Sequence, residues 1–127
     1  MISISAVIGI IMIHLLGDFV FQTNEMALNK SKSNYWLTLH VLVYTLVTFL
    51  GWNFCLLQPS ILYSIEDLFK VIILVFTTHW ITDYITSRIS SKYFEKKDNH
   101  NGFLVIGIDQ VLHYIQLLWI YYLSVKI

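Results

Sequence analysis

The sequence has little cysteine, proline and charge, and each shortage excludes a class of protein. A single cysteine, Cys55, excludes an internal disulfide and a cysteine-rich metal motif. One proline and an aromatic content of 16% exclude a disordered chain. Charged residues make up 13% of the chain, about half the share of a typical soluble domain. Basic and acidic residues balance at eight each, so we expect no nucleic-acid partner.

Long apolar runs replace the missing charge. With 57% hydrophobic residues and a mean hydropathy of +0.66, the chain is too apolar for a surface that faces water on every side. Four runs of about 20 residues have the length that a helix needs to cross a hydrocarbon core of about 30 Å. They do not alternate between polar and apolar residues, which excludes strands. The runs cover residues 1–21, 35–57, 68–87 and 102–125.

The segments between these runs are short and polar. The sequence therefore predicts one all-α integral membrane domain over residues 1–127, folded as a four-transmembrane-helix up-and-down bundle. Pro59 and Ser60 predict the turn after the second span. The first run has no basic leading region and contains His14 and Asp18, so we expect a retained span rather than a cleaved signal peptide.

Lysine and arginine gather in two of the polar segments. Residues 22–34 and 88–101 contain six of the eight basic residues: Lys30, Lys32, Arg88, Lys92, Lys96 and Lys97. Because cytoplasmic loops carry an excess of these residues, we expect both loops in the cytoplasm and both termini outside.

Ionisable residues inside the spans are the unusual feature of this chain. Each costs about 2.5–3.5 kcal/mol on insertion scales, so it is expected to serve a function. The seven are His14, Asp18, His40, His79, Asp83, Asp109 and His113. Six of them form three His–Asp pairs with a spacing of four residues, which places each pair on one helix face. Given alternating helices, all seven lie within roughly 5–15 Å of the surface where loops 22–34 and 88–101 lie.

The first and third spans share a short pattern. Residues 14–19 (HLLGDF) and 79–84 (HWITDY) both read His, two apolar residues, a small residue, Asp and an aromatic residue. This predicts a weak internal repeat that relates helices 1–2 to helices 3–4.

Imidazoles and carboxylates in one layer indicate a metal site. This donor set suits zinc, manganese or iron, and the absence of thiolates from the layer argues against copper(I) and iron–sulfur clusters. A catalytic zinc takes three protein ligands and an open position, so seven donors suffice for one or two divalent ions. We expect zinc as the metal, with manganese or iron as alternatives. We expect all seven residues as candidate ligands. Asp18, Asp83 and Asp109 are also the candidate catalytic residues, because a carboxylate that is not a ligand can act as a general base.

Other polar residues border this layer. Gln22 extends the face of His14 and Asp18, and Gln110 lies three residues before His113. Lys30 and Arg88 lie at the ends of the spans, where they can hold an anionic head group. We expect these four to contact substrate or to support the ligands. Tyr44, four residues after His40, is positioned to hydrogen-bond inward.

These residues also carry a family resemblance. At His14, Asp18, Phe19, Gln22, Lys30, His40, Asp109, Gln110 and His113 the chain resembles the small bacterial and phage membrane proteins known as domain of unknown function 3307. The resemblance covers nearly the whole chain, and implies a bacterial or phage origin and no established activity. Placement in a bacterial inner membrane follows as an expectation. In type, though not in alignment, the chain is also similar to membrane-bound metal-dependent hydrolases.

The leading hypothesis is a membrane-embedded metal-dependent hydrolase that acts on a lipid, a lipid-linked group or another membrane-proximal substrate, as a monomer or homodimer. The alternatives are a transporter or channel for metal ions or protons, and a small interaction or regulatory protein with a structural polar layer. A di-iron oxidase is a smaller alternative, because no glutamate lies inside a span. Sparse polar groups in the far half of the bundle favour a one-sided enzyme site over a transport path.

Overall fold

The computed structural model describes residues 2–56 and 64–126, and these contain helices and no β-strand. The all-α prediction is confirmed for this part of the chain. The turn predicted at Pro59 and Ser60 lies outside the described residues. The elements are α1 (Ile4–Leu15), a π-helical turn η1 (Leu16–Val20), α2 (Asn24–Asn29), α3 (Asn34–Gly51), a second π-helical turn η2 (Trp52–Leu56), α4 (Ile65–Glu95) and α5 (Asn99–Lys126).

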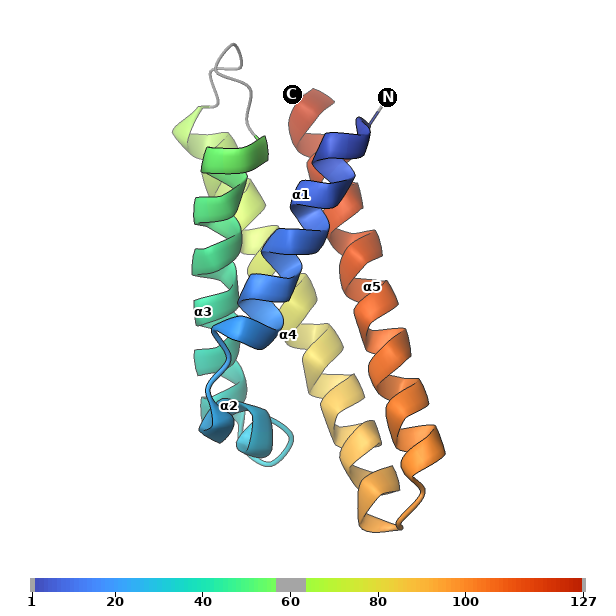
Figure 1. Cartoon of the computed structure of the whole chain (residues 1–127). Helices are drawn as coiled ribbons and strands as arrows, with labels where there is room; N and C mark the ends of the chain where they lie inside the picture. The colour runs from blue at the N-terminus through green and yellow to red at the C-terminus, as the bar shows by residue number, and fades with distance from the viewer. Residues whose placement is uncertain (1, 57–63, 127) are drawn as a thin grey trace.

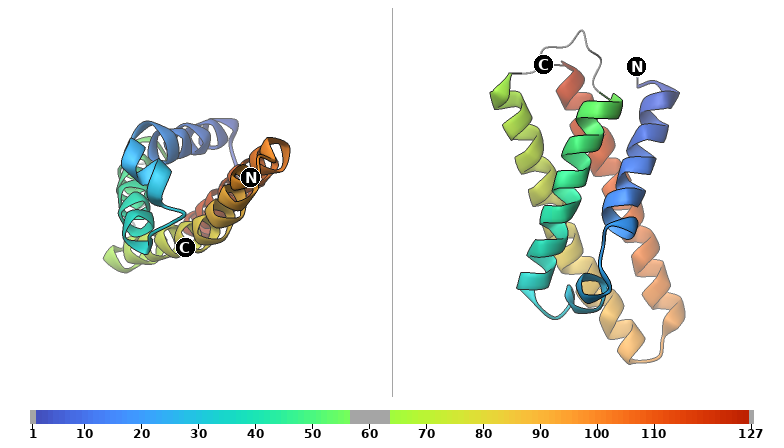
Figure 2. Two further views of the ribbon diagram at one scale, coloured as in Figure 1. Left: turned by 90° about the horizontal axis from the view of Figure 1, so that it is seen from below. Right: turned by 60° about the vertical axis from the view of Figure 1, so that its left-hand side comes forward.

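The long helices pack side by side. α1 contacts α3 and α5, and α4 contacts the same two helices (Figure 1). The start of α1 and the end of α5 lie at the same end of the molecule. At the opposite end the hairpin of α4 and α5 extends beyond the lower ends of α1 and α3 (Figure 2).

Three helical stretches are long and apolar enough to cross a membrane. They are Asn34–Phe54, Ile65–Glu95 and Asn99–Val125, with mean hydropathies of 1.4, 1.4 and 1.6. The first predicted span corresponds to a shorter apolar helix, Ile4–Val20. Length and composition therefore support a membrane protein.

The prediction of a loop over residues 88–101 was wrong. α4 continues to Glu95 and α5 begins at Asn99, so the connection is only residues 96–98. Hydropathy marks where an apolar span ends, but residues 88–95 contain no glycine or proline to end the helix. Close packing holds this extension together, because a Cβ at Gly102 would lie 2.7 Å from the ring of Phe94. The predicted loop 22–34 likewise contains the short helix α2.

The turn between α4 and α5 places a lysine in a backbone conformation that favours glycine. Lys97 has φ of 59°. Its amide donates to the carbonyl of Phe94, and the amide of Asp98 donates to that of Tyr93, both at 2.9 Å. This pair of hydrogen bonds is the Schellman motif, in which glycine usually ends the helix. Here Lys97 takes the place of the glycine. Asp98 then caps α5, since its Oδ1 accepts from the amide of Asn101 at 3.1 Å.

Lys97→Gly is therefore expected to stabilise the protein by about 0.5–1 kcal/mol, because glycine adopts this backbone conformation without steric cost. Thermal unfolding in mild detergent measures the effect. Lys96→Gly is the matched control, since Lys96 has φ of −82° and gains nothing from glycine. A lower melting temperature for Lys97→Gly than for wild type would contradict this account of the turn.

An apolar core fills the half of the molecule that lies away from the turn between α4 and α5. It contains Ala6, Ile10, Ile13, Tyr44, Trp52, Val71, Val75, Leu117 and Ile120. The other buried side chains described in this half are neutral, as at Thr45, Thr48 and Ser124. The buried histidines and aspartates lie beyond this core, towards loop 22–34 and the hairpin.

Candidate metal centre

Five helical segments bring the seven ionisable residues together. His14 lies in the last turn of α1, Asp18 lies in η1 and His40 lies in α3, while α4 supplies His79 and Asp83. Asp109 and His113 come from α5. All seven are buried. Their donor atoms form three overlapping groups, each with all atoms within 4.8 Å: Asp18, His40, His79 and Asp83; Asp83, Asp109 and His113; and His14, Asp18 and His113.

The first group, the four-donor group, centres on His40. Its Nε2 lies 3.2 Å from Nε2 of His79 and 3.1 Å from Oδ1 of Asp18. The same atom lies 3.3 Å from Oδ2 of Asp83. Nε2 of His79 lies 3.6 Å from Asp18 Oδ1 and from Asp83 Oδ2. Two imidazoles and two carboxylates thus direct one atom each at a common point.

These separations match a tetrahedral metal site. Ligands at about 2.0–2.1 Å from zinc lie about 3.3–3.4 Å from one another at the corners of a tetrahedron. The five separations given above run from 3.1 to 3.6 Å. Five of the six separations therefore suit zinc ligands, and the donor atoms of Asp18 and Asp83, which form the sixth pair, lie within 4.8 Å of each other.

The second group, the three-donor group of Asp83, Asp109 and His113, shares a carboxylate with the first. Asp83 directs Oδ2 towards the four-donor group and Oδ1 towards His113, whose Nε2 is 3.4 Å away. Asp109 Oδ2 lies 3.4 Å from the other nitrogen of that imidazole. A carboxylate with one oxygen in each group is suited to bridge two metal ions.

Several buried imidazole nitrogens have no hydrogen-bond partner among the described residues. They are both nitrogens of His113 and Nδ1 of His40 and His79. A buried polar atom without a partner costs about 1–3 kcal/mol. A metal ion in the three-donor group would satisfy one nitrogen of His113, but a metal in the four-donor group, held by Nε2 of His40 and His79, would leave both of their Nδ1 atoms without a partner.

The charge of the cluster also fits a divalent cation. Asp18, Asp83 and Asp109 bring three negative charges if ionised. Among the residues that the structure describes, one ammonium contacts them, that of Lys30, at 2.9 Å from Asp83 Oδ2. Burial lowers the pKa of Lys30, but the carboxylates of Asp83 and Asp18 outweigh burial and raise it, so the lysine stays protonated. With neutral histidines about two negative charges remain, and buried charge requires compensation.

His14 is held by hydrogen bonds at both ring nitrogens. Its Nε2 lies 2.8 Å from the side-chain oxygen Oε1 of Gln110, and its Nδ1 lies 3.0 Å from the hydroxyl of Tyr44. The side-chain nitrogen Nε2 of Gln110 donates to Asp18 Oδ2 and Asp109 Oδ2, both at 3.0 Å. Because a carbonyl only accepts, Nε2 of His14 carries the proton. In this arrangement His14 and Gln110 hold the carboxylates in place, and the inward hydrogen bond expected of Tyr44 is confirmed.

A glycine allows α1 to approach this network closely. Gly17 lies in the π-helical turn η1, and a Cβ there would lie 2.9 Å from the ring of Tyr44. Single π-helical turns inside helices are frequent at functional sites. Here the turn carries Asp18, while the corresponding Asp83 lies in regular α-helix, so the two halves of the proposed repeat differ at this point.

Gly17→Ala is expected to destabilise the protein by about 1–3 kcal/mol, because the methyl group must displace Tyr44 and with it the hydrogen bond to His14. Thermal unfolding compared with Gly107→Ala measures this. A Cβ at Gly107 meets no atom within 4 Å, so that variant is expected to be neutral or more stable by up to about 1 kcal/mol. Equal stability of the two variants would exclude the proposed close approach.

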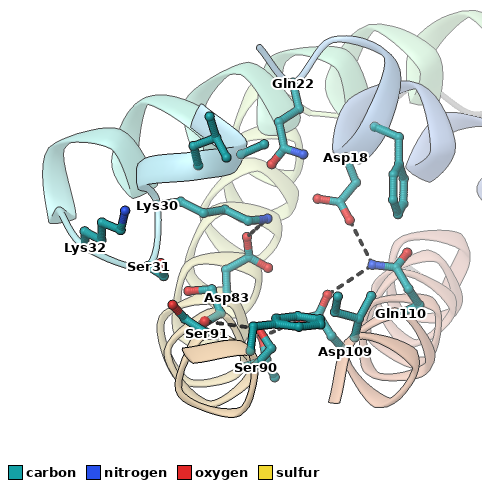
Figure 3. A pocket seen from close by; sticks show the side chains of 17 residues that line it. Asp18, Gln22, Lys30, Ser31, Lys32, Asp83, Ser90, Ser91, Asp109 and Gln110 are labelled. Carbon is teal, nitrogen blue, oxygen red and sulfur yellow. Dashed lines mark hydrogen bonds and ion pairs between the residues drawn. The ribbon is translucent and has the colours of Figure 1, made fainter. Parts of the chain in front are cut away.

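A cavity of about 380 Å³ opens beside the carboxylates (Figure 3). Asp18, Asp83 and Asp109 line its inner side, and Gln22, Lys30 and Gln110 surround them. Lysines and serines of loop 22–34 and α4 line the remainder together with apolar side chains. A small molecule in this cavity would therefore meet the aspartates of both groups directly.

Comparison with known families decides the identity of the chain. Residues 6–127 match the family described as Protein of unknown function (DUF3307). The chain belongs to this family. No curated protein and no solved structure matches it. The resemblance seen in the sequence is thus confirmed over nearly the whole chain.

Two predicted residues of this DUF3307 protein have different positions relative to the cavity. Gln22 lines it. Arg88 does not: its guanidinium donates to Asn34 and to the carbonyl of Tyr84 and lies 3.8 Å from the ring centre of Tyr84. The arginine thus connects α4 to the start of α3.

One contact of the site was missed in the sequence. Thr86 donates a hydrogen bond from its hydroxyl to Oδ1 of Asp109 and lines the cavity. Thr86 lies three residues after Asp83, so helical spacing places it on the same face and was the available signal.

Proposed function

We propose that this protein is a membrane-embedded metal-dependent hydrolase that acts on a lipid or another membrane-proximal substrate. The four-donor group carries the proposal, because two histidines and two aspartates converge, and five of the six separations between their donor atoms are 3.1–3.6 Å, close to those between ligands of tetrahedral zinc. Zinc is the first candidate, and manganese and iron suit the same ligands.

The two groups support different roles. A metal with four protein ligands has no open position, as in structural sites. The three-donor group leaves one. Both of its aspartates, Asp83 and Asp109, line the cavity, as do Asp18 and Asp83 of the four-donor group. A metal there would supply Lewis acidity and an activated water to a substrate in the cavity. Asp109 receives the hydrogen bonds of Thr86 and Gln110, which hold its carboxylate in position as a ligand or as a general base.

The one-sided position of the cluster favours an enzyme over a transporter. A transport path requires polar groups across the whole bilayer. Among the described residues, the buried side chains of the opposite half are apolar or neutral and include no histidine, aspartate, glutamate, lysine or arginine. Ions that reach the cluster from loop 22–34 would thus meet a closed apolar core.

The proposal includes four membrane spans, with Ile4–Val20 as the shortest, and places both termini outside a bacterial inner membrane. Large apolar side chains exposed on all four long helices, such as Ile8, Leu46, Ile73 and Ile115, support contact with lipid. The α4–α5 turn carries Lys96 and Lys97, which supports its placement in the cytoplasm. The internal repeat and a monomeric or homodimeric state belong to the same proposal.

Asp109→Asn tests the enzymatic role. We expect this variant to keep metal in the four-donor group and to lose hydrolysis by at least about a hundredfold, because general-base catalysis alone contributes about 10²–10⁴-fold. Product release from short-chain phospholipids and esters, with metal content measured on the same samples, provides both readouts. Asp98→Asn is the matched control, because Asp98 lies in the α4–α5 turn outside the cluster. Hydrolysis by Asp109→Asn at the wild-type rate would reject the role of Asp109, and metal-loaded wild type that hydrolyses no substrate in the panel would count against the hydrolase.

A further inference from the structure

The polar wall of the cavity is rich in hydrogen-bond donors. Outside the carboxylates and the side-chain amides of Gln22 and Gln110, it contains two lysines and four serines: Lys30, Lys32, Ser31, Ser87, Ser90 and Ser91. Ammonium groups only donate hydrogen bonds, and serine hydroxyls are able to donate. Such a wall suits a ligand that presents several acceptor oxygens and negative charge.

Two buried atoms at this wall have no partner among the described residues. They are Oγ of Ser87 and the side-chain oxygen of Gln22. Both residues line the cavity, and Gln22 extends towards its centre (Figure 3). Since buried polar atoms are nearly always hydrogen-bonded, the Ser87 hydroxyl indicates where an acceptor oxygen of a ligand would bind, while the Gln22 oxygen, which only accepts, would pair with a protonated ligand oxygen.

The rim of the cavity is apolar. Phe19, Leu28 and Ile106 line it and are also exposed at the surface of the molecule. They come from η1, α2 and α5, so the apolar rim joins the interior of the cavity to the outer face of the helices. An alkyl chain in the surrounding bilayer can reach the cavity across such a rim.

From these observations we propose that the cavity binds a phosphate group, carried by a lipid whose acyl chains cross the rim of Phe19, Leu28 and Ile106. This inference rests on the proposed metal centre and names the substrate class of the hydrolase. Without metal the carboxylates of Asp18, Asp83 and Asp109 repel an anion. Two divalent ions, one in the four-donor group and one in the three-donor group, would neutralise this repulsion, so we expect phosphate binding to depend on metal.

Isothermal titration of zinc-loaded wild-type protein in a neutral detergent tests the proposal. The probes are dihexanoyl phosphatidate, with a methylene group in place of the bridging phosphoester oxygen so that the phosphate is not cleaved, inorganic phosphate and dihexanoylglycerol, which lacks the phosphate. We expect the phosphatidate to bind at least about tenfold more tightly than inorganic phosphate, and the glycerol lipid not to bind measurably. Equal binding of phosphatidate and inorganic phosphate would overturn the lipid source while retaining the phosphate site.

Two variants connect this binding to the cavity. Lys32→Gln is expected to weaken phosphatidate binding about tenfold, because a charge-assisted hydrogen bond is lost, and Ser87→Ala about two- to tenfold. Lys92→Gln and Ser33→Ala are the matched controls, since neither residue lines the cavity, and both are expected to bind as wild type.

Zinc content, measured on every sample, separates the possible failures. Zinc-loaded protein that binds no phosphate probe, or variants of the cavity that bind as wild type does, would overturn this inference alone. Wild type that binds no zinc would overturn both the inference and the metal centre.

Discussion

His40→Ala is expected to weaken zinc binding by at least about a hundredfold. Nε2 of His40 lies 3.1–3.3 Å from donor atoms of Asp18, His79 and Asp83, so this imidazole contacts all three other members of the four-donor group. Removing it leaves three donors and one open corner. Loss of a mere supporting hydrogen bond to a ligand typically costs about 10–100-fold in metal affinity, and loss of a ligand costs more.

Competition with a chromophoric zinc chelator measures this ratio for wild type and variant in the same detergent. His100→Ala is the matched control, because His100 is exposed in the first turn of α5 and lies outside all three donor groups. We expect the control to bind zinc as wild type does. Gel filtration shows whether the variants keep their size, and His40→Gln provides a polar replacement should alanine prevent folding. Wild-type affinity in folded His40→Gln and His40→Ala would place the zinc elsewhere.

Removal of metal is expected to destabilise the wild-type protein strongly. A ligand that binds only the folded state adds about 2.7 kcal/mol of stability when its free concentration is a hundred times its dissociation constant. Chelation removes this contribution and leaves the carboxylates of Asp18, Asp83 and Asp109 buried with one contacting ammonium, that of Lys30. We therefore expect a loss of at least about 3 kcal/mol on addition of a chelator.

Thermal unfolding with and without chelator gives the size of this loss. The double variant His79→Ala, Asp83→Ala is expected to unfold at the same temperature in both conditions, because it lacks half of the four-donor group. Asp109→Asn adds a second check: it removes one buried negative charge, so its chelated form is expected to be more stable than chelated wild type. A chelator that leaves the wild-type melting temperature unchanged would be incompatible with a metal-stabilised cluster.

Hydropathy was sufficient to predict the apolar helical segments, but neither their ends nor the short helix α2. The four apolar runs correspond to α1 with η1, α3 with η2, α4 and α5. The extension of α4 to Glu95 was missed because polarity was taken as the end of the helix, while the residues there are compatible with a helix and pack against α5. The π-helical turn at Gly17 arises where α1 packs closely against Tyr44, and helix–helix contact of this kind is not encoded in periodicity.

Spacing predicted the composition of the cluster well. The three pairs His14–Asp18, His79–Asp83 and Asp109–His113 are each within 3.6 Å in the structure, as residues one helical turn apart are expected to be. Alternating helix directions then placed the pairs at one depth. The same argument correctly placed His40 beside them, although it has no partner on its own helix.

The sequence could not assign different roles within this layer. That His14 is engaged by Tyr44 and Gln110, while His40 and His79 face each other at 3.2 Å, depends on how the helices rotate against one another. Lys30 approaches Asp83 only because α2 folds loop 22–34 back over the cluster. Arg88, equally basic and near the same depth, binds Asn34 instead.

The metal content of the purified protein tests the central claim most directly. Plasma mass spectrometry of wild type, purified in mild detergent without added metal and then reloaded after chelation, is expected to show about one or two equivalents of zinc, manganese or iron per chain. His40→Ala treated in parallel is expected to show strongly reduced content, and His100→Ala the wild-type content. Well-folded wild type that holds no metal, as purified and after reloading, would contradict the metal centre and leave the histidines and aspartates as a polar packing layer.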